Sequence, residues 1–333
     1  MATIRALLLQ SAAMQTPSKI VSPQRDVPQP DGRGTQFDHV DCLKVFDDTL
    51  EQEEAAGRAS AFRLKGCDLL QRPGYLVWNE EFGAKWSPPD GTPNPNLWTF
   101  QVGRGENGWG NNEWQTYEEG IAKVKNGVLS IPVQWHGRAD DRYTSARMVS
   151  KFSFQYGRVD VKAKFARTSG LWSAIWMLPD NPVCTAGGQS GEVWPWGGEI
   201  DIMEVVAKDP AVVHGTVHTE TYNHLKGTQQ GRMARVKDPD NWHIYTVVWD
   251  KDMIQFAIDG FVYNRYDNDH RGDCRTWPFD RPFHIIMNVA VGGNWGANYG
   301  PNGEQYVHHE EMRAGAADPR NTMQVDWIRV FSR

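Results

Sequence analysis

Hydrophobic and polar positions follow different patterns on the two sides of about residue 70. From Tyr75 onward, short runs of β-branched and aromatic residues are separated by Gly, Asn, Asp and Pro at intervals of roughly ten residues, a pattern typical of an all-β sandwich. We therefore predict one all-β domain over residues 71–333. The clearest predicted strands are RVDVKAKF (158–165), EIDIM (199–203), HIYTVVWD (243–250), IQFAI (254–258), FHIIMNVAV (283–291) and QVDWIRVF (324–331).

Two of these runs predict local structure in more detail. Asp259 and Gly260 separate IQFAI from FVYNRY (261–266), and Asp-Gly is one of the dipeptides that best tolerate positive φ at both corners of a two-residue hairpin turn. The run QVDWIRVF (324–331) alternates apolar and polar residues. We therefore expect the C-terminus to end inside a sheet.

Residues 1–70 are expected to form an N-terminal extension. Residues 16–35 are rich in turn-forming residues and are expected to be loose, whereas residues 41–65 are charged and contain alanine, which indicates a helix with a weak apolar stripe. So short a segment buries little core. We expect a tail that packs on the sandwich or is mobile, rather than a second functional module.

Charge and hydropathy exclude several classes of function. The net charge is -6 at pH 7 and no run of Lys or Arg is present, so the chain lacks the basic surface that nucleic acid requires. No stretch reaches the roughly 18 apolar residues that a membrane span needs. The segment MATIRALLLQSAAMQ (1–15) resembles a secretory signal only weakly.

Tryptophan and cysteine add two constraints. The chain holds 15 Trp although its mean hydropathy is only -0.59, and because Trp is hard to bury completely, several are expected to line surfaces or clefts. The cysteines lack a CxxC spacing, which argues against a zinc ribbon or a dithiol redox site. Two disulfides or four thiols are both compatible with Cys42, Cys67, Cys184 and Cys274.

The segment GGEIDIMEVV (197–206) places three acids in one predicted strand. Because side chains alternate along a strand, Glu199 and Asp201 share one face, while the isoleucines beside them point into the core. Strict alternation would turn Glu204 inward, where an unpaired carboxylate costs several kcal/mol. We therefore predict a β-bulge at 202–203, whose extra residue returns Glu204 to the face of the other two acids.

Three carboxylates on one face repel each other, so at least one of them binds a proton more tightly. Glycoside hydrolysis uses such a split, with one ionised carboxylate at the anomeric carbon and one carboxyl that protonates the leaving oxygen. Asp201 lies between the two glutamates and is expected to orient Glu199. The acids could instead decorate a solvated strand face or bind a metal, but the tryptophans and paired glycines of WPWGGEIDIME (194–204) favour catalysis.

Through these residues the chain resembles glycoside hydrolase family 16, and within it the laminarinase-like β-1,3-glucanases that carry the bulged E-I-D-I-M-E motif. The resemblance covers roughly residues 75–333 and leaves out the first 70 or so. Besides the carboxylate strand, the matching motifs are VWNEEF (77–82), GWGNNEWQTY (108–117), TSARMVSKFSFQYGRVDVKAKF (144–165), GLWSAIWMLP (170–179), HGTVH (214–218), NVAVGGNWG (288–296) and VDWIRVF (325–331).

The resemblance implies a fold and a reaction. The fold would be a concanavalin A-like β-jelly-roll of two curved antiparallel sheets, with an open cleft for an extended polysaccharide. The reaction would be endo-acting, retaining hydrolysis of β-1,3 or mixed β-1,3/1,4 glucan by double displacement, without a cofactor. Glu199 would be the nucleophile, Asp201 its helper and Glu204 the acid/base.

The resemblance also implies tryptophans that bind the glucan, because the flat C–H faces of sugar rings pack well on indole. Trp194 would be the platform beside the cleavage point. Trp114 and Trp295 follow loops rich in glycine and asparagine and are expected in the cleft. Trp172 and Trp176 are also candidates, although we expect one of these two to lie in the core.

Three polar residues of the matching motifs complete the expected binding site. Asn112 and Arg147 would hydrogen-bond to sugar hydroxyls, although an arginine on a strand face is often simply solvated. His218 would either tune Glu204 or bind a hydroxyl, and the alternative is a structural histidine.

Many members of the resembled family bind one structural calcium ion on the convex side. The matching positions are Glu81, the backbone of Gly127 and Asp326. Carboxylate and carbonyl oxygens suit Ca²⁺. The alternative is a surface acid beside an ordinary turn.

Other functions remain open from the sequence. They are a glucan-recognition protein without hydrolysis, a transglycosylase, a hydrolase of another polymer such as a galactan, and a calcium-dependent lectin-like sandwich. The acids Glu199 and Glu204 favour the hydrolase. We expect an extracellular monomer that binds β-glucan, with neither nucleic acid nor a membrane as partner. Two loops, 180–196 and 267–277, each hold one cysteine and could border the cleft.

Overall fold

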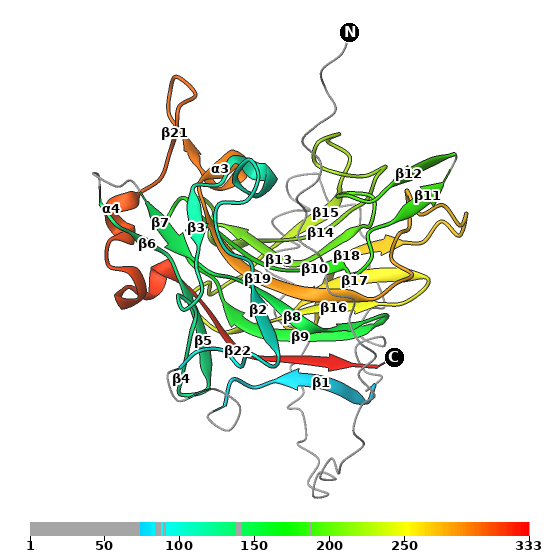
Figure 1. Cartoon of the computed structure of the whole chain (residues 1–333), viewed down its shortest axis with the longest axis horizontal. Coiled ribbons are helices and arrows are strands. Elements are labelled where there is room, and N and C mark those ends of the chain that lie inside the picture. The colour runs from blue at the N-terminus through cyan, green and yellow to red at the C-terminus, as the bar shows by residue number, and fades with distance from the viewer. Residues whose placement is uncertain (1–73, 84–87, 89–90, 138–141, 187, 333) are drawn as a thin grey trace, which may run out of the picture. The chain divides into compact units, whose positions relative to one another are not determined.

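The computed structural model describes residues 74–83, 88, 91–137, 142–186 and 188–332. Nearly all regular structure in these residues is β-strand, arranged in two large antiparallel sheets that lie face to face (Figure 1). The all-β prediction is confirmed. The predicted extension 1–70, with Cys42 and Cys67, lies outside the described residues. No helix in the described part of the chain is long and apolar enough to cross a membrane.

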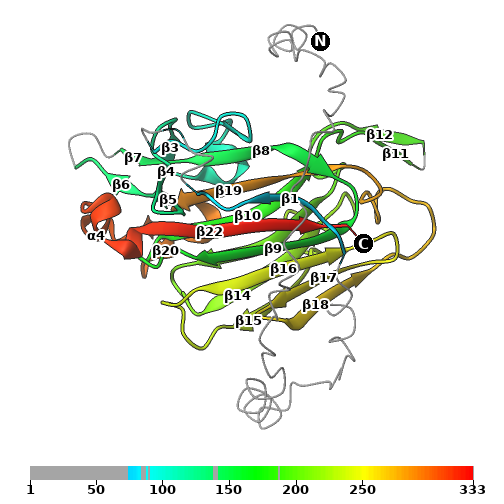
Figure 2. The ribbon, with the colours of Figure 1, turned by 90° about the horizontal axis from the view of Figure 1, so that it is seen from below.

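One sheet, called sheet A, is built around the strand nearest the C-terminus. Figure 2 shows β22 crossing the middle of this sheet beside β1 and β9. The expectation that the C-terminus ends inside a sheet is therefore confirmed. In order, sheet A comprises β18 (Phe261–Asp267), β17 (Met253–Ile258), β16 (His243–Trp249), β9 (Gly157–Lys164), β22 (Thr322–Phe331), β5 (Val128–Pro132) and β4 (Lys123–Lys125), and β1 (Leu76–Glu80) pairs with β22.

The other sheet, called sheet B, carries the three acids on its central strands. Its long strands β10 and β19 pair with each other over nine residues, which gives the sheet a continuous middle. In order, sheet B comprises β15 (Gln230–Arg235), β14 (Val212–His218), β13 (Glu199–Val206), β10 (Leu171–Pro179), β19 (Phe283–Val291), β8 (Arg147–Phe154) and β2 (Trp98–Phe100).

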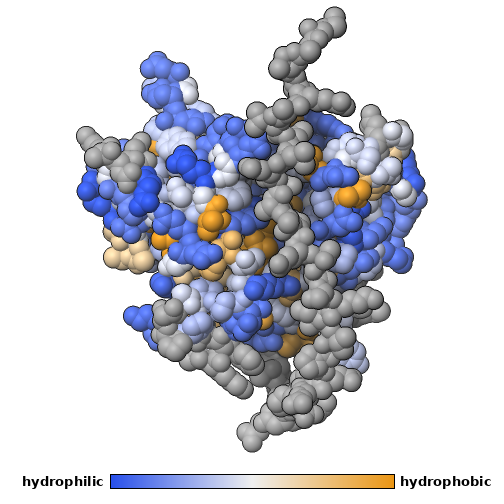
Figure 3. All heavy atoms as spheres, in the orientation of Figure 1, coloured by the Kyte–Doolittle hydropathy of each residue, from blue (hydrophilic) through white to orange (hydrophobic). Residues whose placement is uncertain are grey.

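Smaller elements surround these sheets. The short strands are β3 (Gln115–Tyr117), β6 (Gln134–Trp135), β7 (Tyr143–Ser145), β11 (Cys184–Ala186), β12 (Gln189–Gly191), β20 (Asn298–Tyr299) and β21 (Gln305–Tyr306). The helical turns are η1 (Gly108–Asn112), α3 (Gly293–Gly296), α4 (His309–Met312), η2 (Gly315–Ala317) and η3 (Pro319–Asn321). Figure 3 shows mostly hydrophilic residues on one face, with apolar residues in small patches.

The core lies between the inner faces of the two sheets. Along β10, Ile175 and Met177 are fully buried in one apolar cluster with Val159 and Val161 of β9. These positions are two residues apart on each strand, as the period of a strand requires. The other face of sheet B points away from this core, and we call it the site face.

The predicted hairpin at Asp259 and Gly260 is confirmed. Ile258 pairs with Phe261, so the turn contains two residues. Both have positive φ, 49° at Asp259 and 87° at Gly260. The Asp259 carboxylate accepts hydrogen bonds from the backbone N–H of Ile244 and lies 2.7 Å from a ring nitrogen of His243.

Candidate active site

The β-bulge in β13 brings the three acids to one face. Asp201 is opposite Thr216 and Glu204 is opposite His214, so two residues of β13 face the single residue between them on β14. These two residues, 202–203, are both buried in the core cluster. The predicted bulge is confirmed, and it turns Glu204 to the site face.

Glu199 and Asp201 lie against one histidine and one tryptophan. The indole N–H of Trp194 donates to Oε2 of Glu199 at 2.8 Å. Nε2 of His218, on the neighbouring strand, lies 3.3 Å from Oδ2 of Asp201 and 3.9 Å from Oε1 of Glu199. Nδ1 of His218 is buried without a hydrogen-bond partner among the described residues, so it is free to accept a hydroxyl of a bound ligand.

Glu204 is hydrogen-bonded to a second tryptophan. The indole N–H of Trp172, on β10, donates to Oε1 of Glu204 at 3.0 Å. The Trp295 ring meets Trp172 edge to face at 5.2 Å between centroids and meets the ring of His214 at 5.0 Å. Trp295 therefore lies on the Glu204 side of the site face, and its role in binding substrate stays a prediction.

Burial and mutual repulsion favour the protonated forms of all three acids. Burial, with the neighbouring charge of Asp201, raises the pKa of Glu199 to about 8. Burial also raises the pKa of Asp201, which is hydrogen-bonded to Glu199. The pKa of Glu204 is raised well above its usual value by burial and then by the charges of the other two. The three groups thus share protons, and each of them keeps its proton to a higher pH than an ordinary carboxyl does.

One ligand atom from each of Glu199, Asp201 and His218 lies within 4.8 Å of the other two, a spacing that a metal ion could use. However, the Trp194 N–H already donates to Glu199. Carboxyls with raised pKa values hold protons rather than the negative charge that a divalent cation requires. The geometry therefore favours acid–base chemistry at this position.

An arginine between two tryptophans forms another part of the site face. The guanidinium carbon of Arg147 lies 4.5 Å from the ring centroid of Trp109 and 4.8 Å from that of Trp176. Its Nε donates to Oε1 of Gln101 at 2.6 Å. Arg147 is buried rather than solvated, so it can offer donors to a ligand from a fixed position.

A buried hydrogen-bond chain supports Arg147 and its two tryptophans, and it was not predicted from the sequence. The Trp176 N–H donates to Asn288 at 2.8 Å, and the Asn288 amide donates to the Tyr117 hydroxyl at 3.1 Å. That hydroxyl lies 3.3 Å from Oε2 of Glu113, which also accepts from Gln115 at 2.6 Å. Glu113 lies in the motif GWGNNEWQTY (108–117), and Asn288 lies in NVAVGGNWG (288–296). Their presence in these motifs is the one sequence signal that could have identified them.

The structure distinguishes the remaining predicted tryptophans. Trp172 and Trp176 are both half-buried on the site face with their N–H groups bonded to polar side chains, so the expectation that one of them lies in the core was wrong. The physical reason is their even spacing on β10, which puts both opposite the core face. Trp114 packs against the core, against Tyr143 and close to Gly292, and no contact brings it to the acids.

Asn112 stands at the exposed end of η1. Its side-chain amide donates to Oδ1 of Asn294 at 2.9 Å. This bond ties the loop of η1 to α3, the turn that carries Trp295. Asn112 is therefore placed near one edge of the site face, with its role in binding a hydroxyl still a prediction.

The two carboxylates predicted to bind calcium are already paired with protein cations. Glu81 accepts two bonds from the Arg329 guanidinium, at 2.9 and 3.0 Å, and Asp326 lies 2.8 Å from Nζ of Lys162. Gly127 follows Asn126 in a turn with positive φ at both residues. As arranged here these residues do not fit a calcium ion, because Ca²⁺ would have to displace two cations. Calcium stays a prediction.

Comparisons with known proteins agree on one family. The sequence model of Glycosyl hydrolases family 16 matches residues 110–329. The chain is 41% identical over 294 residues to the beta-glucanase of Rhodothermus marinus, covering 82% of this chain and 94% of that protein. It is 31% identical over 281 residues to glucan endo-1,3-beta-glucosidase A1 of Niallia circulans, covering 77% of this chain and 37% of that protein. The X-ray structure of the laminarinase from Rhodothermus marinus aligns with a TM-score of 0.66 at 40% identity, covering 78% of this chain and 97% of that one.

Proposed function

The chain belongs to glycosyl hydrolases family 16, and from this premise we propose that it cleaves internal β-1,3 linkages of glucans, including mixed β-1,3/1,4 glucans, with retention of configuration. The relatives named above are a beta-glucanase, an endo-1,3-beta-glucosidase and a laminarinase. Their shared substrate class supports a β-glucan as the substrate here.

The observation that carries this proposal is the pair of glutamates on one face of β13. Each accepts a hydrogen bond from a tryptophan N–H, Glu199 from Trp194 and Glu204 from Trp172. These bonds fix where both carboxyls point. Because burial and the charges of Asp201 and Glu199 favour the protonated form of Glu204, we assign Glu204 as the acid and Glu199 as the nucleophile.

In the first step, the ionised carboxylate of Glu199 attacks the anomeric carbon while Glu204 gives its proton to the departing glycosidic oxygen. Glu199 must have lost its proton at that moment, although burial and the charge of Asp201 raise its pKa. His218, 3.3 Å from Asp201, is placed to affect this balance. In the second step, Glu204 takes a proton from water, which attacks the glycosyl-enzyme ester and releases Glu199.

The groups around the acids suit a neutral polysaccharide. Half-buried indoles offer flat apolar surface. Arg147 and His218 stand beside them as fixed polar groups. A β-glucan presents both apolar ring faces and hydroxyls, so it matches this combination.

The test is hydrolysis of laminarin, mixed-linkage glucan and agar, followed by the release of reducing ends. The Glu199→Gln variant should lose laminarin turnover by a factor of roughly 10⁴ or more, because it removes the nucleophile. Glu192→Gln, an exposed glutamate in the same loop as Trp194, is the matched control and should keep full activity. Early products should have the β configuration by NMR.

Two results would contradict the proposed hydrolysis of β-glucan. Binding of laminarin without turnover would make the chain a glucan-recognition protein. Turnover of agar but not of laminarin would assign it to a galactan. Products that first appear in the α configuration would leave hydrolysis intact and overturn the retaining mechanism.

We further propose that the protein acts outside the cytoplasm as a monomer. The disulfide between Cys184 and Cys274 supports an oxidising compartment. The acids and both indole donors come from one chain, so a second copy is not needed to complete the site. Size-exclusion chromatography with light scattering should give one chain's mass of 37.7 kDa, and a stable dimer would contradict this.

A further inference from the structure

Two loops flank Glu199, and each carries one ring of a small aromatic wall. Trp194 belongs to the loop 180–198, and His224 belongs to the loop 219–229. The two rings meet at 5.0 Å between centroids, and His224 also meets His218 at 5.3 Å. We call Trp194 and His224 the nucleophile-side wall, since Trp194 donates to Glu199.

The Trp194 loop is closed upon itself behind this wall. Cys184 is opposite Gly191 in the β11–β12 hairpin. The Trp196 ring packs so tightly on Gly191 that a Cβ there would meet it at 2.1 Å. The position of Cys184 is thus transmitted through Gly191 and Trp196 to Trp194, which lies between these two residues in the sequence.

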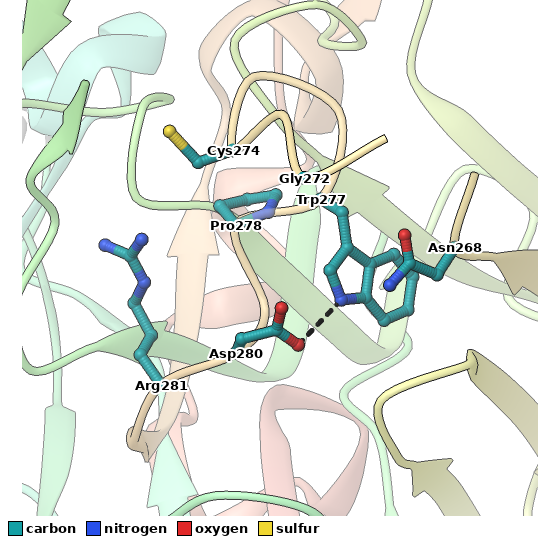
Figure 4. Close-up of a pocket in the computed structure, with 7 residues that line it drawn as sticks. All are labelled: Asn268, Gly272, Cys274, Trp277, Pro278, Asp280 and Arg281. Carbon is teal, nitrogen blue, oxygen red and sulfur yellow. Dashed lines mark hydrogen bonds between the residues drawn. The ribbon is translucent and has the colours of Figure 1, made fainter. Parts of the chain in front are cut away.

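A third segment, 268–281, holds this loop from outside. Cys274 forms the disulfide with Cys184, and Nη1 of Arg281 donates to the backbone carbonyls of Asn181 at 2.8 Å and Val183 at 2.6 Å. Figure 4 shows Cys274 and Arg281 on one side of a small pocket and Trp277 on the other. One segment therefore fixes both the base and the hairpin of the Trp194 loop.

The same segment holds the loop of His224. The backbone N–H of Thr221 donates to the carbonyl of Arg275, the residue after Cys274, at 3.0 Å. Asn223 is fully buried and donates to the carbonyls of Thr219 and Glu220, which closes this loop just before His224.

The segment itself is rigidly built. The Arg275 guanidinium pairs with the Asp273 carboxylate at 2.6 Å. The Trp277 N–H donates to Oδ1 of Asp280 at 2.9 Å, drawn in Figure 4, and the Tyr156 hydroxyl donates to the same oxygen at 2.7 Å. Because these bonds fix segment 268–281, the segment can set the positions of the two loops that are attached to it.

We propose that the Cys184–Cys274 disulfide is a positioning element of the active site, which holds the nucleophile-side wall so that the Trp194 N–H stays on Glu199. This inference rests on the proposed function. The disulfide touches neither the acids nor the substrate and acts through the loop of Trp194.

The consequence is specific because a hydrogen bond to a carboxylate favours its ionised form. If Trp194 moves away, Glu199 keeps its proton to a higher pH, and the acidic limb of the pH–rate profile moves up. The other groups that face Glu199 stay where they are. They are Asp201 and Glu204 on its own strand, His218 on β14 and, at longer range, Arg147 on β8. His224 is the one titratable group that moves with the wall.

The experiment removes the disulfide by the double substitution Cys184→Ala and Cys274→Ala. We expect kcat/KM for laminarin to fall about tenfold, the effect of one charge-assisted hydrogen bond, and the acidic limb to move to higher pH. Trp194→Phe should give the same two changes. Because both act through one contact, the combined variant should lose no more than Trp194→Phe alone.

Three controls separate positioning from general destabilisation. Thr185→Val removes the bond to Ser190 in the same hairpin but keeps the disulfide, and it should keep the wild-type pH profile. Arg281→Met removes the hydrogen bonds to the carbonyls of Asn181 and Val183. It should move the acidic limb in the same direction as loss of the disulfide, and it replaces the cysteine variant if that variant does not fold. All rates are compared well below each variant's melting temperature.

An unchanged acidic limb in the folded cysteine variant, or additive losses in the combined variant, would overturn the positioning role. In that case wild-type turnover of laminarin would still stand. If the wild type itself does not hydrolyse laminarin, the proposed function fails instead.

Discussion

At the scale of single residues, the three acids of β13 are distinguished by their neighbours. Glu199 and Glu204 each accept an indole N–H, whereas Asp201 lies between them beside His218. Asp201 is the most buried of the three. Its negative charge therefore acts on both glutamates through a poorly screened environment.

This arrangement predicts the effect of Asp201→Asn on the pH–rate profile. The charge of Asp201 raises the pKa of Glu199 and that of Glu204. Without that charge both pKa values fall. Glu199 then ionises at lower pH and Glu204 loses its proton at lower pH, so both limbs should move to lower pH, by about one unit. The measurement is kcat/KM for laminarin from pH 3 to 10.

Glu113→Gln is the matched control for lost charge. Glu113 adds to the raised pKa of Glu204 but is not among the causes for Glu199. Its removal should shift only the alkaline limb, and by less. If Asp201→Asn leaves both limbs in place, Asp201 does not set the proton balance of the site.

Sequence reasoning worked at the residue scale where one strand decided the outcome. The faces of Glu199, Asp201 and Glu204 followed from alternation within β13. The place of Arg147 between Trp109 and Trp176 did not, because these residues come from three separate segments. No local pattern records which side chains meet across a sheet.

At the scale of elements, several strands carry an extra residue, β13 and β22 among them, and only the bulge in β13 was predicted. In β13, strict alternation would have placed the charged side chain of Glu204 in the core. Because a buried, unpaired carboxylate costs several kcal/mol, the bulge could be predicted from the sequence. In β22, Val325 is opposite Ala163 and Trp327 is opposite Lys162, so Asp326 is unmatched. The apolar positions there change phase, from Val325 and Trp327 to Ile328 and Val330. That change fits a bulge, although the run was predicted as a regular strand.

The bulge in β13 predicts the result of inserting one alanine between Met203 and Glu204. With one residue more after the bulge, alternation turns Glu204 toward the core. The insertion should abolish laminarin turnover and lower stability by several kcal/mol, the cost of a buried carboxylate without a partner. Activity and a denaturant melt measure both.

Met203→Leu keeps the number of residues and the apolar volume. It should cost less than about 1.5 kcal/mol and leave turnover within a few-fold of wild type. Turnover by the insertion variant would show that the position of Glu204 relative to the bulge does not decide which face it occupies.

At the scale of the whole molecule, the sheet architecture was predictable and the links between distant segments were not. Short alternating runs were enough for an all-β sandwich. The bond between Cys184 and Cys274 joins residues 90 positions apart. Four cysteines allow three pairings, and choosing among them needs the fold.

The ion pairs on sheet A lead to a prediction about metal removal. Arg329 and Lys162 already compensate the charges of Glu81 and Asp326. Chelation with EDTA should therefore leave the melting temperature within about 1 °C, since both carboxylates keep their protein partners. A lower melting temperature that added Ca²⁺ restores would show that calcium displaces these cations.

The position of β22 also bears on how the protein is made. This strand, 322–331, lies between β9 and β5 and pairs with β1. Because β22 is translated after β9 and β5, those strands have open edges until β22 has left the ribosome's exit tunnel. Sheet A cannot close before that point, and until then chaperones have two exposed strand edges to protect.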